Sequence, residues 1–249
     1  MPGTDVHPVE RSAPALNDIR AILLDIEGTT TPIAFVHQVL FPYARARVRD
    51  YLEQHADDPA VRADVALLRT EYAAESSRSP DLPPWNPEAY VYWLMDRDRK
   101  STGLKALQGR IWEAGYRTGE LRGKGEVYED VRPALERWHA AGKTIAIFSS
   151  GSIQAQRNLF ANTTAGDLSS FLSDYFDTTT GPKREAGSYR RIAAALRQPP
   201  YAVLFISDVS AELDAARAAG MRTALCVRGT VPNEVPHGHP RIHSLAELA

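Results

Sequence analysis

The most constraining feature of this sequence is a set of short apolar segments, each of which ends in a polar turn. Residues 19–25, 143–149 and 202–208 are apolar runs closed by an acid or a hydroxyl, and 223–227 is a shorter run of this kind. Residues 175–178 are a weaker candidate. Continuous apolar segments of this length are typical of strands that are buried on both faces of a sheet.

Helical patterns separate these segments, at residues 131–141, 153–160, 187–197 and 212–219. Strands that alternate with helices predict a parallel sheet, and right-handed crossovers place the carboxyl ends of all its strands at one edge. We therefore expect an α/β fold with a doubly wound, Rossmann-like parallel sheet. Ligands of such sheets bind at the edge where the strands end.

Residues 33–125 differ from the rest of the chain, because they show long helical periodicity and no clear strand. This segment starts just after the first polar turn, so we expect an inserted α-helical cap near the functional edge of the sheet. Residues 19–32 and 126–249 would form the catalytic core. Residues 1–18 are rich in proline, serine and charge and are expected to form a loose tail.

Composition narrows the classes of function. The chain has 249 residues, with 29 Lys and Arg against 31 Asp and Glu, and this balance disfavours nucleic acid and anionic membrane surfaces as partners. Cys226 is the single cysteine, so an intrachain disulfide is impossible and a reducing cytoplasm fits best. We find no apolar run that could span a bilayer and no signal peptide, and expect a cytoplasmic protein that does not bind membranes.

Polar side chains that could take part in catalysis follow three of the predicted strands or lie in the loops between them. In chain order they are Asp25, Glu27, Ser149, Ser150, Lys183 and Asp208. Each by itself could be a turn former, a helix cap or a surface charge. Because all of them fall at one edge of the predicted sheet, a shared site is the better explanation.

The composition of this site indicates phosphate chemistry. Carboxylates that converge repel one another unless a cation joins them, and oxygen ligands without His or Cys select Mg²⁺. A magnesium site beside hydroxyls and a lysine suits a phosphate group. A carboxylate there can attack phosphorus and form an aspartyl-phosphate.

The same residues resemble the four ordered motifs of the haloacid dehalogenase (HAD) superfamily. The motifs are Asp25-x-Glu27-Gly28-Thr29-Thr30, Phe148-Ser149-Ser150-Gly151, Lys183, and Ser207-Asp208-x-x-x-Glu212. Most members have a second Asp two residues after the nucleophile, whereas Glu27 is the variant of the enolase-phosphatases of methionine salvage. Other stretches resemble that family too, among them Pro42-Tyr43-Ala44, Gln108-Gly109-Arg110-Ile111-Trp112-Glu113, Gly119-Glu120-Leu121 and Lys183-x-Glu185-x-Gly187-Ser188-Tyr189. The resemblance runs from Ile19 to the C-terminus, and only the linker at 122–126 and the tail depart from it.

The resemblance implies a HAD-like core with a helical cap and a bifunctional enzyme. Its substrate would be 2,3-diketo-5-methylthiopentyl-1-phosphate, which is enolised and then dephosphorylated to the acireductone 1,2-dihydroxy-3-keto-5-methylthiopentene. One Mg²⁺ per subunit would serve both steps, in a monomer whose partner is the small phosphorylated substrate. The implied roles are nucleophile and metal ligand for Asp25, acid, base and metal ligand for Glu27, metal ligand for Asp208, and phosphate binding for Ser149, Ser150 and the catalytic Lys183.

Two other functions remain open from the sequence. The same core motifs would serve a HAD phosphatase for another small phosphate monoester, because the cap selects the substrate. They would also serve a module that is phosphorylated on Asp25 without turnover. The base that removes the carbon-bound proton is unassigned, with Glu27, Glu113 and Glu120 as candidates.

Three further features have simpler structural explanations. The pair His237-x-His239 resembles a metal pair, but we expect it in an exposed loop. Trp85, Tyr90, Tyr92 and Trp93 could contact the methylthio group, but aromatic residues at this density usually pack a helical core. Cys226 is expected to be a buried, inert thiol.

Overall fold

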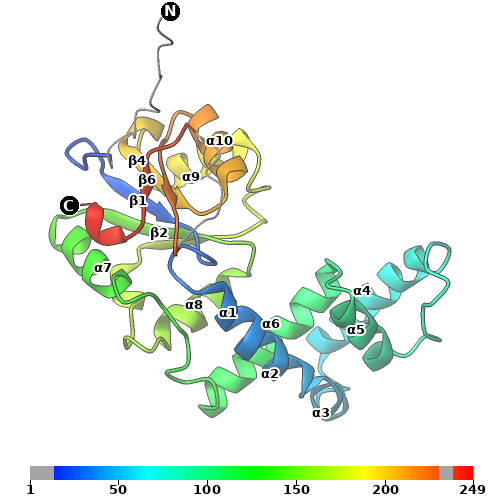
Figure 1. Cartoon of the computed structure of the whole chain (residues 1–249). Coiled ribbons are helices and arrows are strands. Elements are labelled where there is room, and N and C mark those ends of the chain that lie inside the picture. The colour runs from blue at the N-terminus through cyan, green and yellow to red at the C-terminus, as the bar shows by residue number, and fades with distance from the viewer. Residues whose placement is uncertain (1–13, 230–237, 249) are drawn as a thin grey trace, which may run out of the picture. The chain divides into compact units, whose positions relative to one another are not determined.

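The computed structural model describes residues 14–229 and 238–248, and the chain divides into two compact units (Figure 1). The sheet unit comprises the residues up to Ile33 together with those from Gly123 onward, and the helical unit comprises Ala34–Arg122. Within the described part of the chain, no helix is long and apolar enough to cross a bilayer.

Six parallel strands form the sheet, in the order β3-β2-β1-β4-β5-β6. They are β1 (Ala21–Leu24), β2 (Thr144–Phe148), β3 (Asp174–Phe176), β4 (Val203–Ser207), β5 (Arg222–Cys226) and β6 (Arg241–Ile242). The predicted α/β fold with a doubly wound parallel sheet is confirmed. The sequence pattern did not predict β6, because two residues are too few for an apolar run.

Four helices cover the two faces of this sheet: α7 (Val131–Ala140), α8 (Ile153–Ala161), α9 (Ala186–Ala195) and α10 (Ser210–Ala218). Helices α9 and α10 share one core cluster with the alternate strand residues Leu23 and Phe205. Successive strand side chains point to opposite faces, so Ile22 and Ile206 belong to the other face. Figure 1 shows α7 and α8 on the side of the sheet opposite α9 and α10.

The strand order determines where the site lies. The chain leads from β1 outward to β3 and then returns to place β4 beside β1, so the direction of the order reverses between β1 and β4. Such a reversal opens a crevice at the carboxyl ends of the two strands. Asp25 follows β1 and Asp208 follows β4, so both lie at this crevice.

Three short 3₁₀ helices complete the described sheet unit: η2 (Ser169–Phe171), η3 (Pro200–Ala202) and η4 (Leu245–Glu247). Before β1, Leu16 is buried, and its carbonyl accepts a hydrogen bond from Nζ of Lys143 at 3.0 Å. Leu16 therefore belongs to the packed core, although the sequence pattern placed it in the tail.

The helical unit consists of short helices at its start and three longer ones. They are α1 (Ile33–Phe35), the π-helix η1 (Val36–Leu40), α2 (Phe41–Arg45), α3 (Val48–Gln54), α4 (Pro59–Glu75), α5 (Pro87–Asp96) and α6 (Thr102–Thr118). Asp58, Asn86 and Ser101 cap the three longer helices through their side-chain oxygens.

The aromatic residues of the helical unit pack its core. Tyr90 is 2% exposed and Trp93 is 6% exposed, and their rings stack with centroids 5.9 Å apart. Trp85 and Tyr92 are partly buried against the same cluster. The structure therefore favours the core explanation for these four aromatic residues.

Candidate active site

Asp25 is held by three donors at the crevice. Its Oδ1 accepts hydrogen bonds from its neighbour Ile26 N at 2.8 Å and from Nζ of Lys183 at 2.7 Å, and its Oδ2 accepts one from Oγ of Ser207 at 2.8 Å. The side chain is buried. Donors from three different segments therefore fix the carboxylate in one orientation, as a nucleophile requires.

Lys183 joins two carboxylates. Its Nζ lies 2.7 Å from Oδ1 of Asp25 and 2.7 Å from Oε2 of Glu212, and its side chain is 11% exposed. Burial alone would lower the pKa of Lys183, but the charges of Asp25 and Glu212 outweigh it and raise the pKa. The lysine therefore keeps its positive charge in the crevice, where it can meet a phosphate group.

Glu212 and Ser207 are site residues to which sequence reasoning gave no role. Both belong to the fourth motif, and this membership is the sequence feature that could have identified them. Their roles follow only from the contacts. Burial, and then the charge of Asp25, raises the pKa of Glu212 to about 7. Glu212 and Asp25 both contact Nζ of Lys183, so the two carboxylates together orient the lysine.

The turn after β1 carries Glu27. The backbone N–H groups of Thr29, Thr30 and Thr31 all donate to the carbonyl of Ile26, at 2.9 to 3.2 Å, and close this turn tightly. Glu27 is half-buried, and burial followed by the charge of Asp25 raises its pKa. A carboxyl with a raised pKa holds a proton more readily, which suits a general acid.

Asp208 lies beside the same turn. Its Oδ1 is buried and has no hydrogen-bond partner within the described residues, and a Cβ at Gly28 would overlap its carboxylate. Burial, followed by the charge of Asp25, raises the pKa of Asp208 to about 6. The glycine, with φ +71°, gives the carboxylate room next to the turn.

These carboxylates fit a magnesium ion by their chemistry. In the described part of the chain, no group of three His, Cys, Asp or Glu side chains is arranged to hold a metal. Mg²⁺ does not require such a group, because it is commonly bound through one or two carboxylates together with water and substrate phosphate. The partnerless buried oxygen of Asp208, and the carboxylates of Asp25 and Glu27 that raise its pKa, are hard oxygen donors for this ion.

Ser149 and Ser150 occupy the turn between β2 and α8. Ser149 is 1% exposed, and its Oγ accepts a hydrogen bond from Gly151 N at 3.1 Å. Ser150 is exposed. Gln156, which sequence reasoning missed, donates from Nε2 to the carbonyl oxygens of Gly151 and Phe176, both at 2.8 Å, and so fixes this turn.

Two further candidates lie in the helical unit. Glu120 in the helical unit forms an ion pair with Arg47, whose hydrogen bond lowers the pKa of the carboxyl. A carboxyl with a lowered pKa holds a proton less readily, so Glu120 is less suited to take up a carbon-bound proton. Glu113 is exposed on α6.

The expectation of an exposed loop is wrong for His239. The imidazole is buried, with Nδ1 2.8 Å from Oγ1 of Thr223 and Nε2 3.1 Å from Oδ1 of Asp214. These polar partners satisfy the ring inside the protein. His237 lies outside the described residues. Cys226 is buried, as predicted, and burial raises the pKa of its thiol to about 11.

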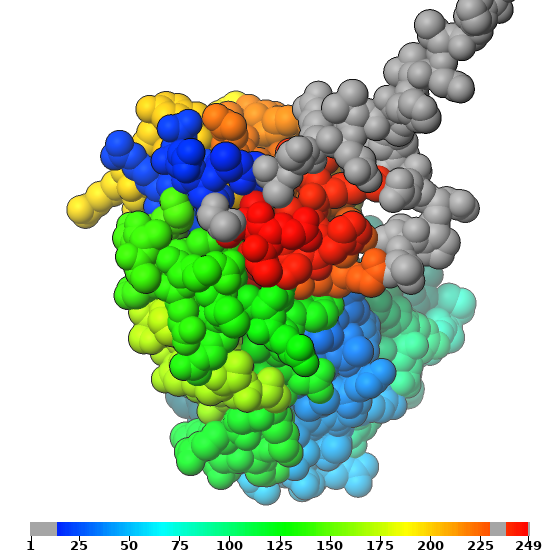
Figure 2. Space-filling model, turned by 60° about the vertical axis from the view of Figure 1, so that its left-hand side comes forward, coloured from blue at the N-terminus to red at the C-terminus, as the bar shows by residue number. Residues whose placement is uncertain are grey.

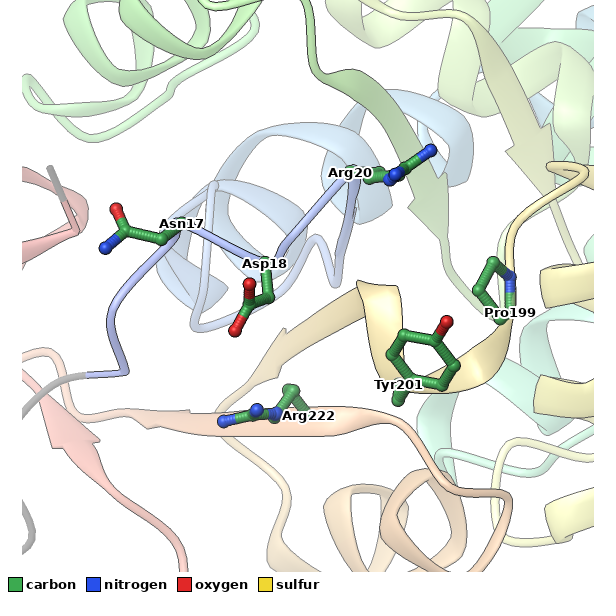
Figure 3. A pocket seen from close by; sticks show the side chains of 6 residues that line it. All are labelled: Asn17, Asp18, Arg20, Pro199, Tyr201 and Arg222. Atoms are coloured by element: carbon green, nitrogen blue, oxygen red, sulfur yellow. The ribbon is translucent and has the colours of Figure 1, made fainter.

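An open pocket lies at the opposite edge of the sheet, where the strands begin. Its lining residues are Asn17, Asp18, Arg20, Pro199, Tyr201 and Arg222. In Figure 3 the side chains of Arg20 and Arg222 point away from each other, so they do not converge on a common ligand. The chemically capable residues therefore lie at the carboxyl edge and not in this pocket.

Comparison with known proteins relates most of the chain to one family. Residues 19–220 match the family model of the haloacid dehalogenase-like hydrolases. Enolase-phosphatase E1 of Synechococcus elongatus is 56% identical over 237 residues, which are 92% of this chain and 98% of that protein. Its counterpart in Frankia alni is 50% identical over 91% of this chain and 94% of that protein. The crystal structure of the UTR4 protein of Saccharomyces cerevisiae is 33% identical, with a TM-score of 0.69 over 91% of this chain and 98% of its own.

Proposed function

Because the chain belongs to the haloacid dehalogenase-like hydrolases and, among them, to the enolase-phosphatases, we propose that Asp25 is the nucleophile of its phosphatase reaction. The substrate in this proposal is 2,3-diketo-5-methylthiopentyl-1-phosphate. The observation that carries the assignment is the cluster of Asp25, Lys183 and Ser207, in which three donors orient one buried carboxylate at the crevice. The proposed product is the acireductone 1,2-dihydroxy-3-keto-5-methylthiopentene.

The first half of phosphate transfer forms a bond between an Asp25 oxygen and phosphorus, and breaks the bond between phosphorus and the substrate oxygen. Glu27 in its acid form gives its proton to that leaving oxygen. The place of Glu27, two residues after Asp25 in the tight turn that follows β1, supports this role. Lys183, with Ser149 and Ser150 at the neighbouring turn, would hold the phosphate oxygens.

The second half releases phosphate. Glu27, now a carboxylate, takes a proton from water, and the water oxygen attacks phosphorus. The bond between phosphorus and Asp25 breaks, and the Asp25 carboxylate is restored. The three donors that hold Asp25 return it to its starting orientation.

Asp25, Asp208 and Glu27 are the residues that would hold Mg²⁺. When bound, the ion would offset negative charge on the phosphate and the carboxylates. The cost of keeping the buried Asp208 carboxylate charged, which is visible in its raised pKa, supports a cation at this place.

The helical unit, Ala34–Arg122, is proposed to act as the substrate-selecting cap. The alternative of a HAD phosphatase for another monoester differs from the main proposal only in what this unit selects.

The further expectations of a monomer and of a cytoplasmic location belong to the same proposal. Light scattering after size-exclusion chromatography tests the first of them.

The test follows phosphate release and enol absorbance together, with the diketo methylthiopentyl phosphate as substrate. Wild type with and without Mg²⁺ is compared with Asp25→Asn. The proposal expects that both signals require Mg²⁺ and that Asp25→Asn loses phosphate release. If wild type released phosphate from simple monoesters but left this substrate unchanged, the HAD chemistry would stand and the salvage assignment would be wrong.

A further inference from the structure

A buried arginine lies next to the turn that carries Glu27. Arg228 follows β5, and its side chain is 11% exposed. Its Nε and Nη2 donate to the carbonyl of Thr29, at 3.1 and 2.7 Å, and its Nη1 lies 2.7 Å from Oδ2 of Asp130. One edge of the planar guanidinium thus contacts the turn that carries Glu27, and another edge contacts the carboxylate of Asp130.

The turn that carries Glu27 is also held by hydrogen bonds from other segments, and Arg228 provides one of these contacts. The internal backbone hydrogen bonds of the turn use the carbonyl of Ile26 and that of Thr31, which accepts from Gly28 N at 2.9 Å. The carbonyl of Thr30 accepts a hydrogen bond from Tyr128 N at 3.0 Å. Within residues 14–229 and 238–248, Arg228 is the donor to the carbonyl of Thr29. The turn is therefore tied at two successive carbonyls, and one of the two ties is a side chain.

Asp130 extends the contact to the C-terminal segment. Besides Arg228, its Oδ2 accepts hydrogen bonds from Oγ of Ser244 at 2.7 Å and from Leu245 N at 2.6 Å. Figure 2 shows this segment, in red, packed against the green residues of the sheet unit, and Trp138 of α7 donates to the carbonyl of Leu248 at 3.1 Å. A carboxylate with this many donors, whose side chain is 15% exposed, holds the guanidinium in a fixed place.

We propose that Arg228 is a positioning residue, which sets the place of Glu27 relative to Asp25 by holding the carbonyl of Thr29. Thr29 is two residues from Glu27 in the same tight turn, so a shift of that carbonyl moves the Glu27 backbone. Proton transfer to the leaving oxygen depends on distances of a few tenths of an ångström. This inference rests on the proposed acid and base role of Glu27.

A purely structural role for Arg228 would have a different signature. If the arginine only tied the C-terminal segment to α7, its loss would lower activity by the same factor whether or not Glu27 could transfer protons. If it acts through Glu27, its loss should matter little once the Glu27 carboxyl has been removed. A double-mutant cycle separates these two cases.

The experiment measures phosphate release from the diketo methylthiopentyl phosphate at saturating Mg²⁺ for wild type, Arg228→Met, Glu27→Gln and the double variant. We expect Arg228→Met to lower kcat by about tenfold to a hundredfold, as for a misplaced proton-transfer group, with KM within about threefold. In the Glu27→Gln background the same substitution should cost less than about threefold.

Arg132→Met is the matched control. Arg132 binds a carboxylate and a carbonyl in the same manner, with Nε 2.8 Å from Oε1 of Glu136 and Nη1 2.6 Å from the carbonyl of Ala165, but its side chain is 46% exposed. Its substitution should leave kcat and KM unchanged. Thermal unfolding by circular dichroism checks the fold of each variant, and Arg228→Lys enters the same cycle if Arg228→Met does not fold.

The outcomes are distinct. An equal loss in both backgrounds, or a rise in KM with unchanged kcat, would overturn the positioning role of Arg228. If Glu27→Gln itself released phosphate at the wild-type rate, the proposed role of Glu27 would fail instead. A loss on Arg228→Met that disappears in the Glu27→Gln background supports both.

Discussion

Replacing Asp208 by Asn should stabilise the metal-free protein at alkaline pH, although most substitutions of buried residues destabilise. The charged carboxylate has a buried oxygen without a partner and lies near Asp25, which is also negative. An amide of the same shape carries no charge, so it avoids the cost of burying a charge and the repulsion from Asp25.

The magnitude follows from the pKa of Asp208, which burial and the charge of Asp25 raise from 3.8 to about 6. At about 1.4 kcal/mol per unit, this shift gives an upper limit of about 3 kcal/mol. Asp208 is partly open to solvent, which screens the repulsion, so we expect a gain of about 1 to 2 kcal/mol.

The gain should depend on pH with a defined sign. The folded protein binds the Asp208 proton more tightly than the unfolded chain does, so wild-type stability falls as the pH rises from about 4 to about 6. Above that window the loss is complete, and the advantage of Asp208→Asn is full at pH 8. At pH 5 roughly half of the advantage should remain.

Urea unfolding in EDTA, followed by circular dichroism at pH 5 and pH 8, measures this difference. Asp57→Asn is the control, because Asp57 is exposed, and its substitution should change the free energy of unfolding by less than about 0.5 kcal/mol. Added Mg²⁺ should stabilise wild type more than Asp208→Asn, since a ligand of the folded state stabilises it by mass action. An Asp208→Asn protein that is less stable than wild type at pH 8, or equally favoured at both pH values, would refute the reasoning.

Three further predictions concern stability and activity. Gly28→Ala should lower the free energy of unfolding by about 1 to 3 kcal/mol and weaken Mg²⁺ binding, because its Cβ would overlap Asp208 at φ +71°. Gly142→Ala, at φ +70° with open space around the position, should cost less and leave metal titrations unchanged. Lys183→Met should abolish phosphate release and lower the free energy of unfolding by about 3 to 5 kcal/mol, since two buried carboxylates lose their cation, and a urea midpoint equal to wild type would contradict this. Leu68→Ala should destabilise the helical unit by about 2 to 5 kcal/mol in calorimetry, and an unchanged melting temperature would disprove that core role.

The parallel sheet, and the edge at which its polar residues collect, could be predicted from the sequence. Continuous apolar segments such as 143–149 can be buried only between two layers of helices, and the handedness of crossovers then fixes the common edge. Asp25, Glu27 and Asp208 could be placed there from the strand ends alone. The resemblance of the motifs to a known family predicted the reaction, and the relatives named enolase-phosphatase support this prediction.

The partners of these groups could not be predicted from the sequence. The contact of Lys183 with both Asp25 and Glu212, and that of Arg228 with Thr29, join residues far apart in the chain. The pattern of residues within one segment predicts which of them are buried and where the chain turns. Which charge faces which, and hence which carboxyl has a raised pKa, depends on how distant segments pack together.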